Sequence, residues 1–262
     1  MCSRFLRIWF CGTSVLGCLV AASETLRVCA DPNNLPLSNA QQQGFENKLA
    51  ELVAAKLGYT LEYTWWAQRK SFIRHSLDEG RCDVLMEVPS SLAAVDTTEV
   101  YYRSTYVFVS RHDRNLQLKS LFDERLSRLR IALPVVGDDY APPAVALAAR
   151  GITANITGFS LFAAEGETDP ARHIIDAVEH SVVDVAIVWG PLAGYFAKSA
   201  PSALDIEPVS PPAFRGIPFT YGMAMGVRKG NTSLRASLND FIAANTPAIQ
   251  RLLVDFAIPQ LP

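Results

Sequence analysis

The chain has 262 residues, of which 49% are hydrophobic and 19% are charged, the balance of a packed globular protein rather than a disordered one. Its formal net charge of −2 excludes the strongly basic surface of a nucleic-acid-binding protein. The sequence has no repeat of fixed period and no low-complexity tract, so it also excludes a solenoid.

Residues 1–23 have the pattern of a secretory signal peptide. Arg4 and Arg7 precede an uncharged apolar run over 8–22 that ends in small residues. The run is shorter than the roughly 20 residues that a membrane-spanning helix needs. We therefore expect a periplasmic protein that starts near Glu24. A retained anchor and lipid attachment at Cys18 are the alternatives.

Only two cysteines, Cys29 and Cys82, lie outside the predicted signal. An even number in an exported chain favours one disulfide, and two buried free thiols are the alternative. No Cys/His group has zinc spacing, and no oxygen-rich loop has calcium spacing. We therefore expect no metal and no cofactor.

The mature chain alternates predicted strands and helices. Apolar or alternating runs predict strands over 26–30, 61–65, 82–88, 101–109, 130–133, 184–189 and 219–227. Apolar residues at helical spacing, with glycine, proline or aspartate at the ends, predict helices over 45–57, 69–79 and 143–150, after 169–170, after 191, and over 233–244 and 247–256.

This alternation predicts an α/β fold with parallel sheets. Two successive α/β blocks, followed by a returning strand and terminal helices, indicate two lobes with a cleft between them. Ligands in such folds bind beyond the carboxyl ends of the strands. The cleft should therefore be lined by the loops 31–36, 87–91, 137–140 and 189–191.

The mature chain resembles the type II periplasmic solute-binding proteins. The resemblance rests on LRVCAD, GFENKLAELVAAKLG, GRCDVLMEVPSS, YYRSTY and VVDVAIVWGPLAGYFAKSA. It implies that residues 24–108 and 222–262 form lobe 1 and that residues 109–221 form lobe 2. It also implies two hinge strands, over 107–111 and 221–227.

The sequence departs from the amino-acid-binding members of that family. Those members clamp the ligand's carboxylate with an arginine, a strong bidentate pair, but the stretch 89–96 contains none. Trp189 and Gly190 stand where those members hold the amino group with an aspartate. We place Asp138 and Asp139 at the start of a lobe-2 helix, where acids repel an anion. Amino acids and simple anions are therefore poor candidate ligands.

A narrower resemblance covers CADPNNLPLSN, the run 63–69, GRCDV, YYRSTYVFV and DVAIVWGPLAGYFA. Together they are similar to the solute-binding-like proteins encoded with quinoprotein alcohol dehydrogenases, the J proteins of methanol-oxidation clusters. The resemblance implies a non-catalytic periplasmic accessory whose partner is a methanol or alcohol dehydrogenase dependent on pyrroloquinoline quinone (PQQ). No enzyme motif in the sequence argues for catalysis.

The candidate cleft residues are polar or aromatic side chains at the predicted strand ends: Asp31, Asn33, Asn34, Trp65, Trp66, Arg69, Glu87, Ser104, Asp138, Asp139, Trp189 and Gly190. Each has a structural alternative. Asp31 suits a turn, Glu87 a hydrated strand end, and the acid pair at 138–139 a helix start. Adjacent strand residues face opposite ways, so at most one of the two neighbouring tryptophans faces the cleft.

Two functions remain open. An accessory should have a wide cleft that cannot close and that grips a segment of its partner. A receptor for an ABC importer should close on an uncharged or cationic solute in a small polar pocket.

The resemblance makes the strands of Cys29 and Cys82 parallel neighbours, with Cys29 late in its strand and Cys82 early. A stagger of two or three residues, at about 3.3 Å per residue, would exceed the usual limit of about 7 Å between bridged Cα atoms. The sequence leaves the bridge open.

Overall fold

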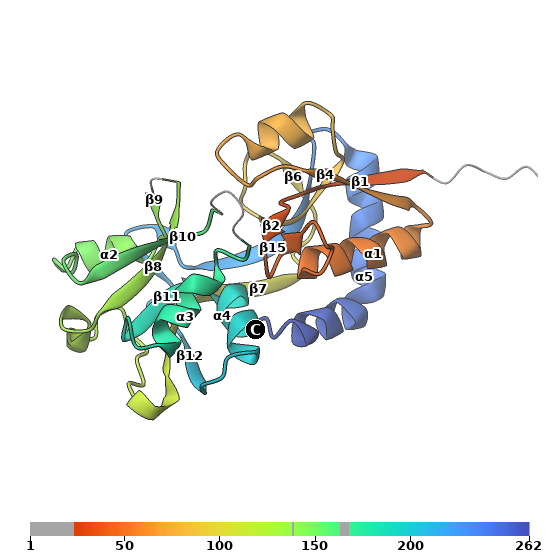
Figure 1. The fold of residues 1–262 in the computed structure, drawn as a ribbon. Coiled ribbons are helices and arrows are strands. Elements are labelled where there is room, and N and C mark those ends of the chain that lie inside the picture. The colour runs from red at the N-terminus through yellow and green to blue at the C-terminus, as the bar shows by residue number, and fades with distance from the viewer. Residues whose placement is uncertain (1–23, 138, 163–167, 262) are drawn as a thin grey trace, which may run out of the picture.

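The computed structural model describes residues 24–137, 139–162 and 168–261, which form two α/β lobes (Figure 1). Lobe 1 contains β1 (Thr25–Ala30), β2 (Asn33–Asn34), β3 (Ser38–Asn39), α1 (Phe45–Leu57), β4 (Thr60–Trp65), η1 (Arg74–Asp78), β5 (Val84–Pro89), β6 (Asp96–Thr97), β15 (Thr220–Val227) and α5 (Thr232–Asp255). Strand β7 (Tyr102–Arg111) runs from lobe 1 into lobe 2.

Lobe 2 contains η2 (His112–Arg114), η3 (Glu124–Ser127), β8 (Ile131–Val136), β9 (Asp139–Tyr140), α2 (Ala144–Ala148), β10 (Ile156–Ser160), α3 (Arg172–Glu179), β11 (Val185–Trp189), α4 (Gly190–Lys198), β12 (Leu204–Pro208), β13 (Ala213–Phe214) and β14 (Ile217–Pro218). In lobe 1, β1 pairs in parallel with β4 and β5. In lobe 2, β8 pairs in parallel with β10 and β11. The predicted α/β class with parallel strand pairs is confirmed.

Strand β7 joins the lobes because it changes partners along its length. Its residues 102–105 pair with β15 of lobe 1, whereas residues 106–111 pair with β11 and β12 of lobe 2. The chain returns beside it, where the Tyr106 N–H donates to the Phe219 carbonyl over 2.9 Å. The change of partner falls a few residues before the lobe boundary that we propose from the family resemblance.

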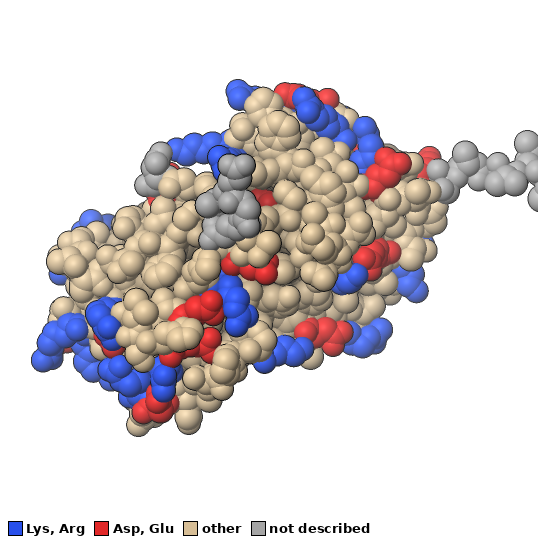
Figure 2. All heavy atoms as spheres, in the orientation of Figure 1, with Lys and Arg blue, Asp and Glu red and all other residues tan. Residues whose placement is uncertain are grey.

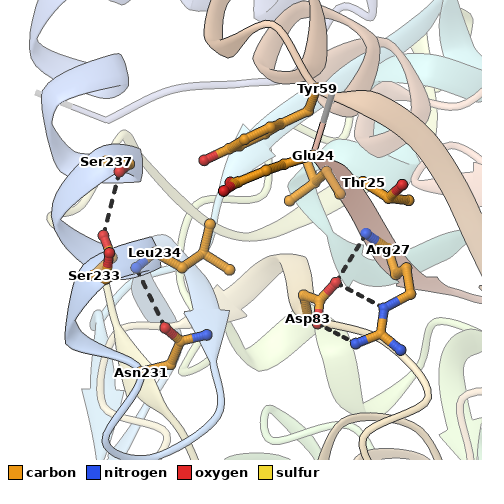
Figure 3. A pocket seen from close by; sticks show the side chains of 10 residues that line it. Glu24, Thr25, Arg27, Tyr59, Asp83, Asn231, Ser233, Leu234 and Ser237 are labelled. Atoms are coloured by element: carbon orange, nitrogen blue, oxygen red, sulfur yellow. Dashed lines mark hydrogen bonds and ion pairs between the residues drawn. The ribbon is translucent and has the colours of Figure 1, made fainter. Parts of the chain in front are cut away.

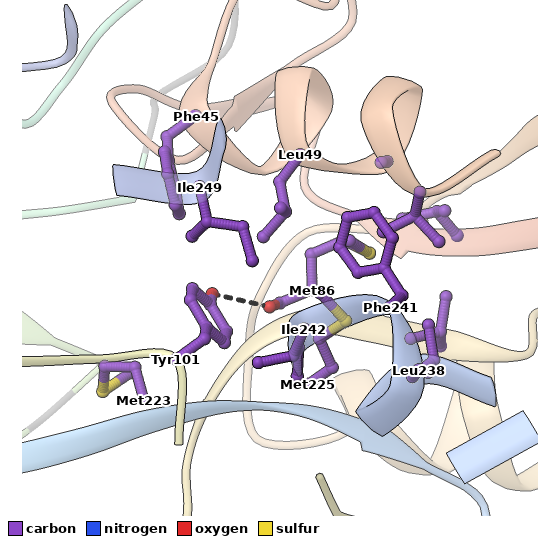
Figure 4. Close-up of a cluster of buried hydrophobic side chains, with 14 of the residues drawn as sticks. Phe45, Leu49, Met86, Tyr101, Met223, Met225, Leu238, Phe241, Ile242 and Ile249 are labelled. Atoms are coloured by element: carbon purple, nitrogen blue, oxygen red, sulfur yellow. Dashed lines mark hydrogen bonds between the residues drawn. The ribbon is translucent and has the colours of Figure 1, made fainter. Parts of the chain in front are cut away.

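The core of lobe 1 lies between the sheet, α1 and α5 (Figure 4). Phe45, Leu49 and Val53 recur every four residues on α1 and are fully buried. The Tyr101 hydroxyl is also inside this core and donates to the Met86 carbonyl over 2.8 Å. The helix expected over 45–57 is confirmed at both ends. Its amphipathic spacing decides where it packs.

Several elements differ from the sequence-based expectations. The helix expected over 69–79 shrinks to η1, and the two terminal helices join into α5 with a kink at Asn245. Pro247 lacks an N–H for the helical ladder, which accounts for the kink. Strands β10 and β12 were missed because neither is a buried apolar run. Their residues are half-buried or exposed.

Cys29 and Cys82 form a disulfide, with their Cα atoms 5.4 Å apart. The stagger argument was wrong because Cys82 precedes β5 rather than lying in it. The loop before β5 turns back over β4, and the Thr64 hydroxyl donates to the Arg81 carbonyl over 2.8 Å. Thr64 is the register partner of Cys29, so this turn brings Cys82 beside it.

The predicted signal peptide over 1–23, with Cys18, lies outside the described residues. Among the residues that the structure does describe, no helix combines the length and the apolar character needed to cross a membrane.

Reducing the disulfide should lower the free energy of unfolding by about 2–4 kcal/mol, because the bridge closes a long loop in the unfolded chain. The two cysteines are 53 residues apart. Urea titrations with and without reductant measure the change. In the control, a Cys29→Ser/Cys82→Ser double variant, reductant should have no effect. Equal stability of the reduced and oxidised wild type would contradict the expectation.

Candidate functional site

The candidate site is the space between the lobes at the carboxyl ends of β1 and β4. A cavity of about 250 Å³ there is lined by Asp31, Asn34 and Gln68 from lobe 1 and by Val136, Leu161 and Phe162 from lobe 2. Pockets for drug-sized ligands occupy about 300–1,000 Å³, so this space lies just below that range.

The loop after β1 crosses the gap between the lobes. Leu35, at its tip, is 7% exposed and belongs to the hydrophobic core of lobe 2, which is built on α3, α4 and the lobe-2 part of β7. Burying a leucine side chain contributes about 1.5–3 kcal/mol. Lobe 1 therefore inserts its own apolar side chain into lobe 2 beside the predicted ligand site.

The polar residues of this loop are already engaged. The two carboxylate oxygens of Asp31 accept from the Asn33 N–H over 2.8 Å and from the Gln68 N–H over 2.6 Å. Asn34 Nδ2 donates to Gln68 Oε1 over 2.8 Å. Asn33 Oδ1 accepts from the Asp169 N–H of lobe 2 over 3.0 Å. Asp31 therefore acts in turn chemistry, whereas Asn33 bridges the lobes.

Two cationic side chains also reach across the gap. The Arg69 guanidinium lies 5.3 Å from the centre of the Phe162 ring. Lys70 Nζ lies 3.9 Å from Asp139 Oδ2, but both side chains are about four-fifths exposed, so this pair is weak. Asp139 lies in β9 and not at a helix start as expected, because α2 begins only at Ala144. Asp138 lies outside the described residues.

Glu87 is buried, at 7% exposure, and not at a hydrated strand end. Burial raises the pKa of its carboxyl to about 7. Tyr102 and Trp189 lie close enough to oppose part of that rise in pKa, although the Tyr102 hydroxyl does not reach hydrogen-bonding geometry. Glu87 Oε2 also has no hydrogen-bond partner. The side chain of Trp189 therefore brings lobe 2 against a buried acid of lobe 1.

Sequence reasoning missed a second buried acid, Glu46, in the first turn of α1. Burial raises the pKa of its carboxyl well above the usual value, and the charges of Glu87 and Asp31 raise it further. The sequence offered no signal, because an acid in the first turn of a helix is ordinary dipole chemistry. None of the ion pairs within the described residues involves Glu46 or Glu87.

Asp31, Ser38, Glu46, Gln68 and Glu87 line a second cavity of about 10 Å³. That volume holds about one water molecule. Within the described residues, no group of three or more His, Cys, Asp or Glu side chains is placed to hold a metal ion. This second cavity can therefore take a water or a proton but not a solute.

The neighbouring tryptophans do not form an aromatic wall between the lobes. Trp65 stacks on Tyr63 at 4.7 Å and packs against the core of lobe 1. Trp66 lies 5.4 Å from His75 and under the Arg81 guanidinium, and is 38% exposed. Both side chains contact lobe 1, and neither lines the 250 Å³ cavity between the lobes.

Gly190 and Ser104 act in packing. A Cβ on Gly190 would lie 2.8 Å from both Ser104 Oγ and the Thr105 carbonyl oxygen, so only glycine lets α4 approach β7 this closely. The Ser104 hydroxyl donates to the Pro259 carbonyl over 2.7 Å and is fully buried. These two residues tie the C-terminal segment to the strand that joins the lobes, and neither is open to a ligand.

The described residues do not form the wide cleft expected of an accessory, because Leu35, Asn33 and Trp189 hold the lobes in contact. The spaces at the strand ends are the cavity of about 250 Å³ lined by Asp31, Asn34 and Gln68 and the cavity of about 10 Å³ at Glu46 and Glu87.

A further hollow of about 430 Å³ lies at the opposite, amino end of β1 (Figure 3). Its wall contains a bidentate ion pair, in which Arg27 Nε lies 2.9 Å from Asp83 Oδ2 and Arg27 Nη2 lies 2.6 Å from Asp83 Oδ1. Tyr59 and α5 complete the wall. Because ligands of α/β folds bind at the carboxyl ends of strands, this hollow is not the candidate site.

Residues 26–249 match the bacterial extracellular solute-binding proteins, family 3. The chain belongs to this family. It is 30% identical over 252 residues to Protein MoxJ of Methylorubrum extorquens, covering 91% of this chain and 82% of that protein.

Two solved structures have a similar fold. MxaJ from Methlophaga aminisulfidivorans matches with a TM-score of 0.80 at 26% identity, over 90% of this chain and 100% of that one. The periplasmic binding protein XoxJ from Methylobacterium extorquens matches with a TM-score of 0.74 at 31% identity, over 91% and 100%. The chain is thus a MoxJ-like type II periplasmic binding protein, which confirms the resemblance drawn from the sequence.

The free energy of unfolding should fall as pH rises from about 4.5 to about 8. The pKa of Glu87 is raised to about 7 in the folded protein. Its contribution is therefore complete below its unfolded pKa and is lost as pH rises through 7, by roughly 3–4 kcal/mol. Urea titrations across this range measure the slope.

A Glu87→Gln variant keeps the shape of the protonated acid and should make this slope shallower, while Glu46, whose pKa is also raised, keeps part of it. Glu99→Gln removes a carboxyl at an exposed position and should leave the slope unchanged. An equally steep fall in stability for Glu87→Gln and the wild type would contradict the assignment.

Leu35→Ala should loosen the contact between the lobes. It removes a side chain buried in lobe 2 and should lower stability by about 2–4 kcal/mol. The Asp169 N–H, bonded to Asn33 on the same loop, should exchange with solvent at least tenfold faster. Leu37→Ala is the matched control, because Leu37 lies on this loop but outside the lobe-2 core. Equal exchange rates of the Asp169 N–H in both variants would contradict the role of Leu35 in holding the lobes together.

Proposed function

We propose that this protein is a non-catalytic periplasmic accessory of a PQQ-dependent methanol or alcohol dehydrogenase, which binds the dehydrogenase or assists its activation. The proposal is supported by the family and by the similarity to MoxJ, MxaJ and XoxJ along most of the chain. The lobe boundaries that go with it are 24–108 plus 222–262 for lobe 1 and 109–221 for lobe 2, after a signal peptide over 1–23.

The observation that carries the proposal is that the chain fills its own ligand site. Leu35 occupies the lobe-2 core and both oxygens of Asp31 are engaged by backbone N–H groups. The cavity at Glu46 and Glu87 holds about one water molecule. In the 250 Å³ cavity between the lobes, Asp31 and Asn34 are both bonded to Gln68. A solute receptor needs polar groups that are free to exchange water for a ligand, and this site offers few. The outer surfaces of the lobes are then the surfaces left for function.

The alternative is a substrate-binding receptor of an ABC importer for a small uncharged or cationic solute. The buried acids favour it. Glu46 and Glu87 are both less than 10% exposed, and Glu87 Oε2 has no partner, so an organic cation entering an opened cleft would relieve their burial. This reading requires the cleft to open so that a cation reaches the two acids.

Titration calorimetry of the purified mature protein with the apo and the PQQ-loaded dehydrogenase tests the proposal. We expect a saturable one-to-one heat with at least one of the two forms. A parallel thermal-shift screen against amines, polyols and other small metabolites should give no stabilisation. No heat with either form would overturn the accessory role, and a stabilising metabolite would then favour the receptor.

A further inference from the structure

An aromatic side chain stands exposed on lobe 2, away from the space between the lobes. Phe122 is 46% exposed and its ring centre lies 5.9 Å from that of Phe214 on β13. The Arg150 guanidinium lies 5.9 Å from the Phe122 ring, and the Arg215 guanidinium lies 5.2 Å from the Phe214 ring. We call these four residues the Phe122 cluster.

The backbone around Phe122 is fixed from both sides. Arg150 Nη1 donates to the Leu121 carbonyl over 2.6 Å and to the Asp123 carbonyl over 3.2 Å, so one guanidinium holds the residues before and after the exposed ring. Leu121 itself is fully buried in a second hydrophobic cluster of lobe 2, separate from the one that contains Leu35. The ring is thus presented to solvent from a rigid frame. That lowers the entropy lost when a partner covers it.

Phe214 and Arg215 lie on a tight hairpin formed by β13 and β14, which is bonded to the loop of Phe122. The Leu121 N–H donates to the Ser210 carbonyl over 2.8 Å, which places the loop of Phe122 beside the segment that leads into β13. Arg215 and Gly216 form the turn between β13 and β14 with φ values of 49° and 80°. Two backbone connections therefore hold Phe122 and Phe214 side by side.

The charge around the cluster is positive. Five basic residues belong to the Phe122 cluster or lie near its members in the sequence: Lys119, Arg125, Arg128, Arg150 and Arg215. The acids in the same stretches are Asp123 and Glu124. Asp123 is neutralised by Arg125, whose Nη2 lies 2.6 Å from Asp123 Oδ2. Figure 2 shows many Lys and Arg side chains, with several Asp and Glu side chains among them, over the lower left of the molecule, the end where the yellow-green segments of lobe 2 lie in Figure 1.

We propose that the Phe122 cluster docks onto an acidic surface of the dehydrogenase, with the Phe122 ring entering an apolar depression there. Aromatic and arginine side chains on a rigid frame are the residues that dominate binding at protein interfaces. The positive rim selects an acidic partner and speeds its association. This inference rests on the accessory function proposed above and assigns that function to a surface.

The test is calorimetry between the dehydrogenase form that binds and variants of the cluster. Phe122→Ala should weaken binding about 10- to 100-fold, the range of an interface hot spot. Arg215→Asn keeps a residue that tolerates positive φ and removes the charge. It should weaken binding severalfold and reduce the dependence of affinity on salt.

Matched controls lie on other surfaces. Val182→Ala and Val254→Ala shorten apolar side chains that are 59% and 67% exposed, and Arg251→Gln removes an exposed charge from α5. All three should bind like the wild type, and every variant should keep the wild-type melting temperature. If Phe122→Ala proves unstable, Arg215→Asn decides alone.

The two levels of the proposal fail in different ways. A wild type that binds no form of the dehydrogenase overturns the accessory function, and the docking surface with it. A wild type that binds while Phe122→Ala and Arg215→Asn bind equally well overturns the docking surface and leaves the accessory function standing.

Discussion

Burial of one lobe-1 side chain inside lobe 2 is the constraint on which the arrangement of the two lobes depends. Leu35 sits in the lobe-2 core, and the loop that carries it is closed by Asp31, whose two oxygens accept backbone N–H groups. A two-lobed binding protein normally exchanges water for a ligand in this place. Here the chain supplies the occupant, which leaves the outer surfaces for function.

The contact between the lobes encloses two buried acids, which are tolerated because they hold protons. Glu46 and Glu87 share a cavity the size of one water molecule and form no ion pair within the described residues. Two buried like charges are costly, and raised pKa values let the acids lower that cost by holding protons. Because Trp189 of lobe 2 lies against Glu87, the protonation of this pair is linked to the contact between the lobes.

Much of the fold could be predicted from the sequence because it depends on local patterns. The apolar spacing of α1 and the buried runs of β1, β5 and β11 identify the α/β lobes, and motif order identifies the family. The site was harder to predict. Leu35 lies in a turn-rich stretch, and nothing local shows that its side chain is buried in the other lobe. The position of Cys82 beside Cys29 and the burial of Glu46 likewise depend on how distant segments pack. The cleft position of Trp65 or Trp66 could not be predicted, because aromatic character alone does not show which way a side chain points.

The central claim is that the ligand site is filled by the chain itself. Native mass spectrometry of the mature protein, purified from periplasm without denaturation, tests this claim most directly. The account predicts the mass of the disulfide-bonded chain with no retained organic ligand. A small molecule bound at one-to-one stoichiometry, and released when the protein is denatured, would contradict it.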